Sequence, residues 1–146
     1  MVAGIMIPTV VADEMLAHAR AELPNEACGL LAGRLIPDDG AETHTYFPAR
    51  NAEASALRYS VHPDDLVRIV FAVDEAGLDL VGIFHTHTRS PAIPSATDRR
   101  AAQYPGAFHV LAALADPTAP PERVLRAWRI HGGHAFEVPL RVVERT

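Results

Sequence analysis

The sequence predicts an α/β fold: one domain in which a curved mixed β-sheet is flanked by helices. Three observations support this class. Short apolar runs such as 80–84 have the length of buried strands. Two segments, 8–22 and 63–76, instead repeat apolar residues at helical spacing. The length of 146 residues, with 49% hydrophobic and 21% charged residues, is typical of a single soluble domain, which we expect to span residues 1–146.

In the first third of the chain, strands surround one amphipathic helix. A short strand at 4–7 precedes the helix at 8–22. The apolar face of this helix consists of Val11, Met15, Leu16, Ala19 and Leu23. A second strand follows at 26–35. The turn at 36–40 contains Pro, Asp and Gly, which favour chain reversal, and leads into a strand at 43–47.

The middle third contains the second helix. We expect a polar loop at 50–55, a short strand at 57–61 and then the helix at 63–76. Pro63 fits the first turn of this helix, and Gly77 lies just past its end. Its apolar face consists of Leu66, Ile69, Val70 and Val73.

The last third adds a short helix and further strands to the sheet. After the apolar run at 80–84, the pattern predicts a helix at 95–104 and a strand at 107–115. Segments 123–131 and 134–140 form a hairpin, because two glycines separate them and supply the positive φ of a tight turn.

Potential metal ligands follow the apolar run at 80–84. His85 and His87 are two residues apart in a strand, so both imidazoles point to the same face. Asp98 follows after a Pro-containing loop. Two His and one Asp make three ligands, which suits a catalytic zinc ion whose fourth position is left to water.

Each candidate residue also has a structural explanation. His85 and His87 can be ordinary polar residues at the end of a strand. Ser95 can be the N-cap of a helix, with Asp98 near the positive end of its dipole. Glu26 can form a surface salt bridge, although a lone charge would be costly to bury at the start of an apolar strand. Cys28 is either a small buried hydrophobic residue or a thiolate nucleophile. His109 is a hydrogen-bonded core imidazole or a ligand, and the former is favoured.

This pattern resembles the signature of the JAMM (MPN+) metalloproteases. The residues that fit its spacing without a gap are His85, Thr86, His87, Ser95 and Asp98. Glu26 lies on an earlier strand in the matching Glu-Ala-Cys-Gly context, and the order of elements agrees over essentially the whole chain. Thr86 stands where many members carry Ser, and it points away from the metal. The resemblance implies a cytidine-deaminase-like (MPN/JAMM) fold.

The resemblance also implies an activity, namely that of a zinc metallopeptidase. His85, His87 and Asp98 would bind Zn²⁺, Glu26 would act as the general base, and Ser95 would hydrogen-bond the oxyanion. The compact chain looks most like bacterial JAMM peptidases that act on a ubiquitin-like sulfur-carrier protein. Cleavage after the carrier's C-terminal Gly-Gly would release cysteine or a short peptide, a step in cysteine or sulfur metabolism.

Other functions also fit parts of this pattern. An isopeptidase that removes ubiquitin-like modifiers from lysine, a non-catalytic MPN scaffold and a zinc-stabilised binding module remain open. A zinc deaminase is excluded, because it needs Pro-Cys-x-x-Cys and the chain has one cysteine. The net charge of −5 argues against nucleic acid as a partner.

The sequence also indicates a location. It contains no membrane-spanning run and no signal-peptide pattern at its start, so no membrane partner is expected. A single cysteine is compatible with a reducing cytoplasm. We therefore expect a cytoplasmic protein, and no feature of the pattern specifies an oligomeric state.

Overall fold

Eight strands form one sheet at the centre of the computed structural model, which describes residues 3–102, 104, 106–116 and 118–144. The strands are β1 (Gly4–Pro8), β2 (Cys28–Ile36), β3 (Gly40–Ala49), β4 (Asp79–His87), β5 (Phe108–Ala113), β6 (Leu125–His131), β7 (His134–Val138) and β8 (Leu140–Val143). The helices are α1 (Thr9–Glu22), α2 (Pro63–Glu75), α3 (Ala96–Ala101) and α4 (Pro121–Val124). The predicted domain bounds of 1–146 include residues outside the described ranges.

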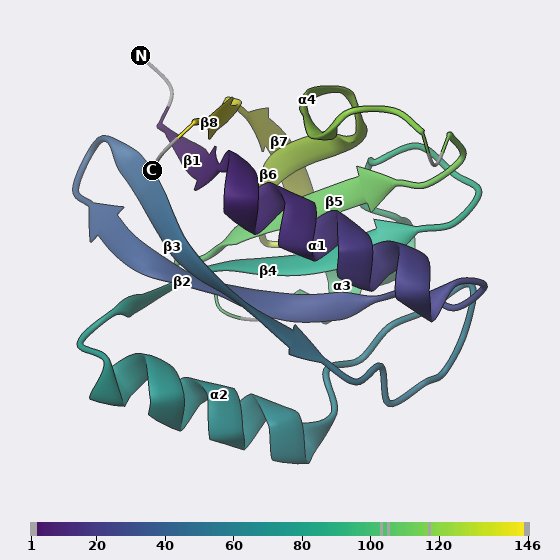
Figure 1. Ribbon diagram of the computed structural model, residues 1–146, viewed down its shortest axis with the longest axis horizontal. Helices are drawn as coiled ribbons and strands as arrows, with labels where there is room; N and C mark the ends of the chain where they lie inside the picture. The colour runs from purple at the N-terminus through teal and green to yellow at the C-terminus, as the bar shows by residue number, and fades with distance from the viewer. Residues whose placement is uncertain (1–2, 103, 105, 117, 145–146) are drawn as a thin grey trace.

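The sheet is mixed and strongly twisted (Figure 1). Its strand order is β7-β6-β5-β4-β2-β3-β1-β8. The pairs β4–β5, β1–β3 and β1–β8 are parallel, and the other neighbours are antiparallel. The two central strands, β2 and β4, are therefore neighbours in space although α2 and β3 separate them in sequence.

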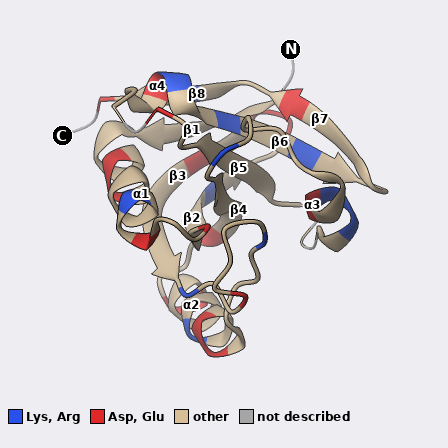
Figure 2. Ribbon diagram, turned by 90° about the vertical axis from the view of Figure 1, so that its right-hand side faces the viewer, with Lys and Arg blue, Asp and Glu red and all other residues tan. Residues whose placement is uncertain are grey.

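Helices cover both faces of the sheet, as Figure 2 shows with α1 on one side and α3 on the other. The larger core lies between α1 and the sheet, where Met15, Phe84 and Phe108 are fully buried. A second core lies under α2, where Ile69 packs with Leu30 and other side chains of the opposite face. The predicted α/β class with a helix-flanked mixed sheet is confirmed.

The strand predicted at 57–61 is wrong. Apart from an isolated bridge between Asn51 and Val61, this segment is a loop. The side chain of Asn51 takes the place of a partner strand: its amide nitrogen donates to the Arg58 carbonyl at 2.9 Å, and its oxygen accepts from the Ser60 amide at 3.0 Å. One side chain thus satisfies backbone groups that a strand would pair in a ladder.

Other boundaries also differ from the pattern. Helix α3 is shorter than predicted, and Tyr104 has a positive φ of 60°, which a helix does not accommodate. Helix α4 and strand β8 were not predicted. Leu23 and Val70, which the sequence pattern places on apolar helix faces, are 40% and 43% exposed. Val70 is turned about 100° from its buried neighbour Ile69, which places it at the edge of the face.

Within the described residues, no helix is long and apolar enough to cross a membrane.

Candidate metal centre

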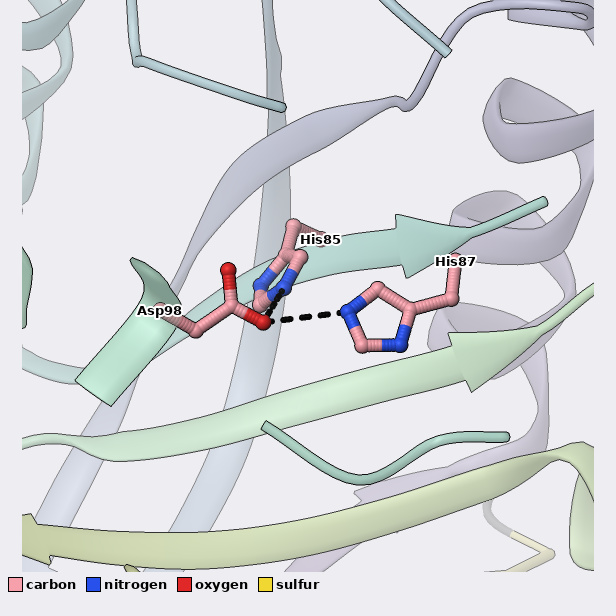
Figure 3. Close-up of side chains that lie close together, drawn as sticks. All are labelled: His85, His87 and Asp98. Carbon is pink, nitrogen blue, oxygen red and sulfur yellow. Dashed lines mark hydrogen bonds and ion pairs between the residues drawn. The ribbon is translucent and has the colours of Figure 1, made fainter. Parts of the chain in front are cut away.

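The two histidines of the motif lie at the end of β4, between β2 and β5. His85 is paired with Cys28 of β2 on one side and with Leu111 of β5 on the other. Both imidazoles point toward Asp98 of α3, as Figure 3 shows, and therefore to the same face of the sheet, as the alternation predicted. Thr86 points to the opposite face, where its hydroxyl accepts a hydrogen bond from the Ala27 amide at 2.9 Å.

Asp98 reaches these histidines from the first turn of α3. Its Oδ2 atom lies 3.1 Å from His85 Nε2 and 3.0 Å from His87 Nε2. The same oxygen accepts a hydrogen bond from the Ser95 amide at 2.9 Å, and the Ser95 hydroxyl accepts one from the Asp98 amide at 3.0 Å. This is a complete capping box, so the predicted N-cap role of Ser95 is confirmed. The cap also orients the Asp98 carboxylate.

The electrostatics of this group favour a cation at its centre. Burial alone would raise the pKa of Asp98, but hydrogen bonds from His85 and His87 outweigh burial and hold that pKa far below its usual range. Burial lowers the pKa of His85. Burial also acts to lower the pKa of His87, yet its hydrogen bonds to Asp98 and Pro91 raise it overall. The carboxylate thus attracts positive charge to the point where the three side chains meet.

The donor atoms fit a metal ion. One ligand atom from each of His85, His87 and Asp98 lies within 4.8 Å of the others. The Pro91 carbonyl can only accept a hydrogen bond, so the His87 Nδ1 atom 2.7 Å from it carries a hydrogen and donates. A metal ion and a proton compete for the remaining Nε2 lone pair, which faces Asp98. Outer hydrogen bonds of this kind are typical of metal-binding histidines.

Glu26 lies two residues before β2 and is only 5% exposed. Its amide donates to the Ser55 carbonyl at 2.7 Å, and its carbonyl accepts from the Asn51 side chain at 3.0 Å, so the backbone is fixed on both sides. Burial raises the pKa of Glu26 to about 7, against the opposing effect of His87 and with a further contribution from Asp98. The alternative of a surface salt bridge is wrong, because the side chain is buried and pairs with no cation within the described ranges.

Tyr59 is a residue of the site that the sequence did not indicate. Its ring stacks on the His85 imidazole with centroids 4.1 Å apart and planes inclined by 16°. Tyr59 also lines a pocket of about 350 Å³ that opens beside Asp98, together with Leu30 and Ile83. The loop closed by Asn51 places Tyr59 there, and no local pattern predicts such a loop.

The two remaining candidates lie outside the ligand group. Burial raises the pKa of the Cys28 thiol to about 12, which disfavours a thiolate nucleophile and supports the small-hydrophobic role. His109 is 3% exposed, and burial lowers its pKa to about 4. It is not among the clustered ligands, although the expected hydrogen bond is missing at its Nε2 atom, which has no partner in the described part of the chain.

Comparison with known proteins shows which proteins this chain resembles. A CysO-cysteine peptidase of Mycobacterium tuberculosis is 36% identical over 141 residues, which cover 97% of this chain and 92% of that protein. A desampylase of Haloferax volcanii is 39% identical over 105 residues, or 68% of this chain and 73% of that protein. A solution structure from Desulfitobacterium hafniense matches 97% of this chain and 94% of its own, with 35% identity and a TM-score of 0.86.

Residues 8–131 match the family described as prokaryotic homologs of the JAB domain. This match covers most of the chain and confirms the resemblance to JAMM metalloproteases. The chain therefore belongs to the family of prokaryotic homologs of the JAB domain.

Proposed function

We propose that this chain, as one domain, is a zinc-dependent peptidase that acts on a ubiquitin-like sulfur-carrier protein. It hydrolyses the bond after the carrier's C-terminal Gly-Gly and releases cysteine or a short peptide. The observation that carries this proposal is the convergence of His85, His87 and Asp98 with the buried carboxyl of Glu26 nearby. The similarity to a protein named CysO-cysteine peptidase, along 97% of the chain, supports the choice of substrate.

His85, His87 and Asp98 would hold the ion. Zinc suits two imidazoles and one carboxylate, and when bound it supplies the Lewis acidity that lowers the pKa of water to about 7. The chain itself holds the three ligand atoms close together in the absence of an ion. The Asp98 carboxylate is held by the Ser95 amide, and the His87 ring is held by the Pro91 carbonyl.

Glu26 would move the proton. A general base works best when its pKa lies near the operating pH, and burial brings the pKa of Glu26 to about 7. Glu26 would accept a proton from the attacking water and pass it to the leaving amine. Because water attacks directly, no acyl-enzyme forms.

Ser95 would stabilise the oxyanion. Its hydroxyl oxygen accepts a hydrogen bond from the Asp98 amide, which leaves the hydroxyl proton free to donate. Ser95 is exposed, so a substrate carbonyl can approach it. The capping role and the oxyanion role are therefore compatible in one side chain.

The depth of the site supports a substrate with a thin tail. The side chains of His85 and His87 are only 1% and 6% exposed. An extended Gly-Gly tail can approach such a site closely, because glycine has no side chain to collide with the walls. The globular body of the carrier would remain outside and contribute affinity through its surface.

The decisive experiment uses a carrier-cysteine adduct. The zinc-loaded protein is incubated with this adduct and with a variant whose penultimate Gly is Ala, and mass spectrometry follows cleavage. We expect release of cysteine from the Gly-Gly form and much slower release from the variant. Absence of release from the Gly-Gly form would contradict the proposed substrate.

An isopeptidase is the second candidate, since the chain also resembles a protein named desampylase. Such an enzyme would remove a ubiquitin-like modifier from lysine. A lysine-linked conjugate, assayed beside the cysteine adduct, separates the two activities. A non-catalytic scaffold or a zinc-stabilised module would cleave neither.

We place the activity in the cytoplasm, where a single buried cysteine such as Cys28 stays reduced.

A further inference from the structure

The orientation of His87 depends on one turn of the loop between β4 and α3. The Pro91 carbonyl accepts the hydrogen bond from His87 Nδ1 at 2.7 Å and a second one from the Ile93 amide at 2.8 Å. The second bond closes a three-residue γ-turn centred on Ala92. Any movement of this turn would therefore move the acceptor that fixes both the ring plane and the tautomer of His87.

Trp128 of β6 anchors this turn to the sheet. Its indole Nε1–H donates to the Ala92 carbonyl at 3.0 Å in a buried contact. The Ala92 side chain is 3% exposed and packs in a small cluster with Trp128 and Leu111. The residue at the centre of the turn is thus held twice, once by its carbonyl and once by its methyl group.

The indole also lies close to a charged pair formed by side chains of β6 and β7. The Arg126 guanidinium lies 5.2 Å from the centre of the Trp128 ring. Two hydrogen bonds of 2.7 and 2.8 Å join that guanidinium to the Glu137 carboxylate of β7. Since β6 pairs with β5 and β5 pairs with β4, the ring rests on the same sheet that carries His87.

We propose that Trp128 is a positioning residue for the metal centre, which it affects through Ala92, Pro91 and His87. Its N–H keeps the Pro91 carbonyl in place, and that carbonyl keeps the proton of His87 on Nδ1. Nε2, which lies 3.0 Å from Asp98 Oδ2, is then the ring nitrogen from which an ion can displace the proton. This inference rests on the proposed zinc site but requires neither the proposed substrate nor turnover.

The test measures zinc affinity and the state of His87 directly. Trp128→Phe keeps an aromatic ring and removes the N–H donor. Ala92→Gly leaves Trp128 intact and removes the methyl group that anchors the turn. Ile130→Val is the matched control, because Ile130 is a buried β6 residue outside the Trp128–Ala92 cluster. Thermal melting first establishes that each variant is folded.

Competition with a chelator should show zinc affinity about tenfold weaker in Trp128→Phe and in Ala92→Gly, at the lower end of the range for outer hydrogen bonds to metal ligands. The control should bind zinc like the wild type. In the zinc-free proteins, the ¹⁵N shifts of His87 should show Nδ1–H less populated in both variants.

If Trp128→Phe does not fold, Ala92→Gly carries the test. Unchanged zinc affinity and His87 shifts in the folded variants would overturn the proposal, whereas failure to cleave any carrier would affect only the proposed substrate.

Discussion

Replacing Ser95 should separate its structural role from its chemical one. In the structure the Ser95 hydroxyl oxygen accepts from the Asp98 amide at 3.0 Å, so Ser95→Ala removes both the cap and the hydroxyl donor. Ser95→Gly also removes the donor, but glycine at an N-cap costs only a few tenths of a kcal/mol, against about 1 kcal/mol for alanine. The two variants therefore differ in stability and share the loss of the proposed oxyanion donor.

The magnitudes decide between the roles. A cap loss of about 1 kcal/mol corresponds to roughly a fivefold change in an equilibrium constant. The loss of one oxyanion donor lowers turnover by roughly 10- to 1,000-fold. We expect Ser95→Gly to retain near-native stability while turnover falls within that range, and Ser95→Ala to show the same loss of turnover with lower stability.

The assay combines urea unfolding with initial rates on a carrier-cysteine adduct. Ser95→Thr, which keeps both the cap and the hydroxyl, is the control and should retain most of the activity. Near-native turnover of Ser95→Gly would refute the oxyanion role and leave Ser95 as a cap only.

Three further predictions concern the same fold. Asp98→Ala should lose most of the zinc, which is about one ion per chain in the wild type, and metal analysis of a folded variant with full zinc content would exclude Asp98 as a ligand. Glu26→Gln should keep zinc but lose roughly 100-fold or more in turnover, so near-native rates would require another base. Hydrogen bonds from Arg50 hold the pKa of Asp65 below its usual range. Because the pKa of an unfolded Asp is about 3.9, this pair stabilises the fold above that pH, and its contribution is lost as the pH falls through the native value. Urea unfolding should show a stability gap between the wild type and Asp65→Asn at pH 7 that narrows in acid; a gap independent of pH would contradict the linkage.

Local rules explain why the sequence brings His85, His87 and Asp98 forward as candidate ligands, and the resemblance to JAMM metalloproteases favours that interpretation over ordinary polar residues at a strand end and a helix start. Alternation along a strand places His85 and His87 on one face whatever the neighbouring strands are. Ser95 and Asp98 belong to a helix start whose hydrogen bonds are made within four residues. Only Glu26 comes from a distant segment, and its assignment needed the resemblance to JAMM metalloproteases.

Long-range contacts explain what the pattern did not predict. Strand β8 exists because it pairs with β1, where Leu140 is in register with Ile5 from the other end of the chain. The segment around Tyr59 has the composition of a strand, but the Asn51 side chain satisfies its backbone and makes it a loop. Nothing in the amino-acid order of either segment identifies its partner.

The contact between Trp128 and Ala92, beside the candidate metal centre, is also a long-range contact. Ala92 and Trp128 are 36 residues apart, and one N–H joins them. A side chain on any strand that passes close to the turn could donate a hydrogen bond to the Ala92 carbonyl, so no spacing rule identifies the donor. His85 and His87, in contrast, share one face of a single strand, and Ser95 and Asp98 share one helix turn, so the spacing within each pair is restricted. The order β4-β5-β6 brings Trp128 to the loop that follows β4. Spacing therefore predicts the side chains that could bind an ion, whereas strand order determines which distant side chains lie close enough to support them.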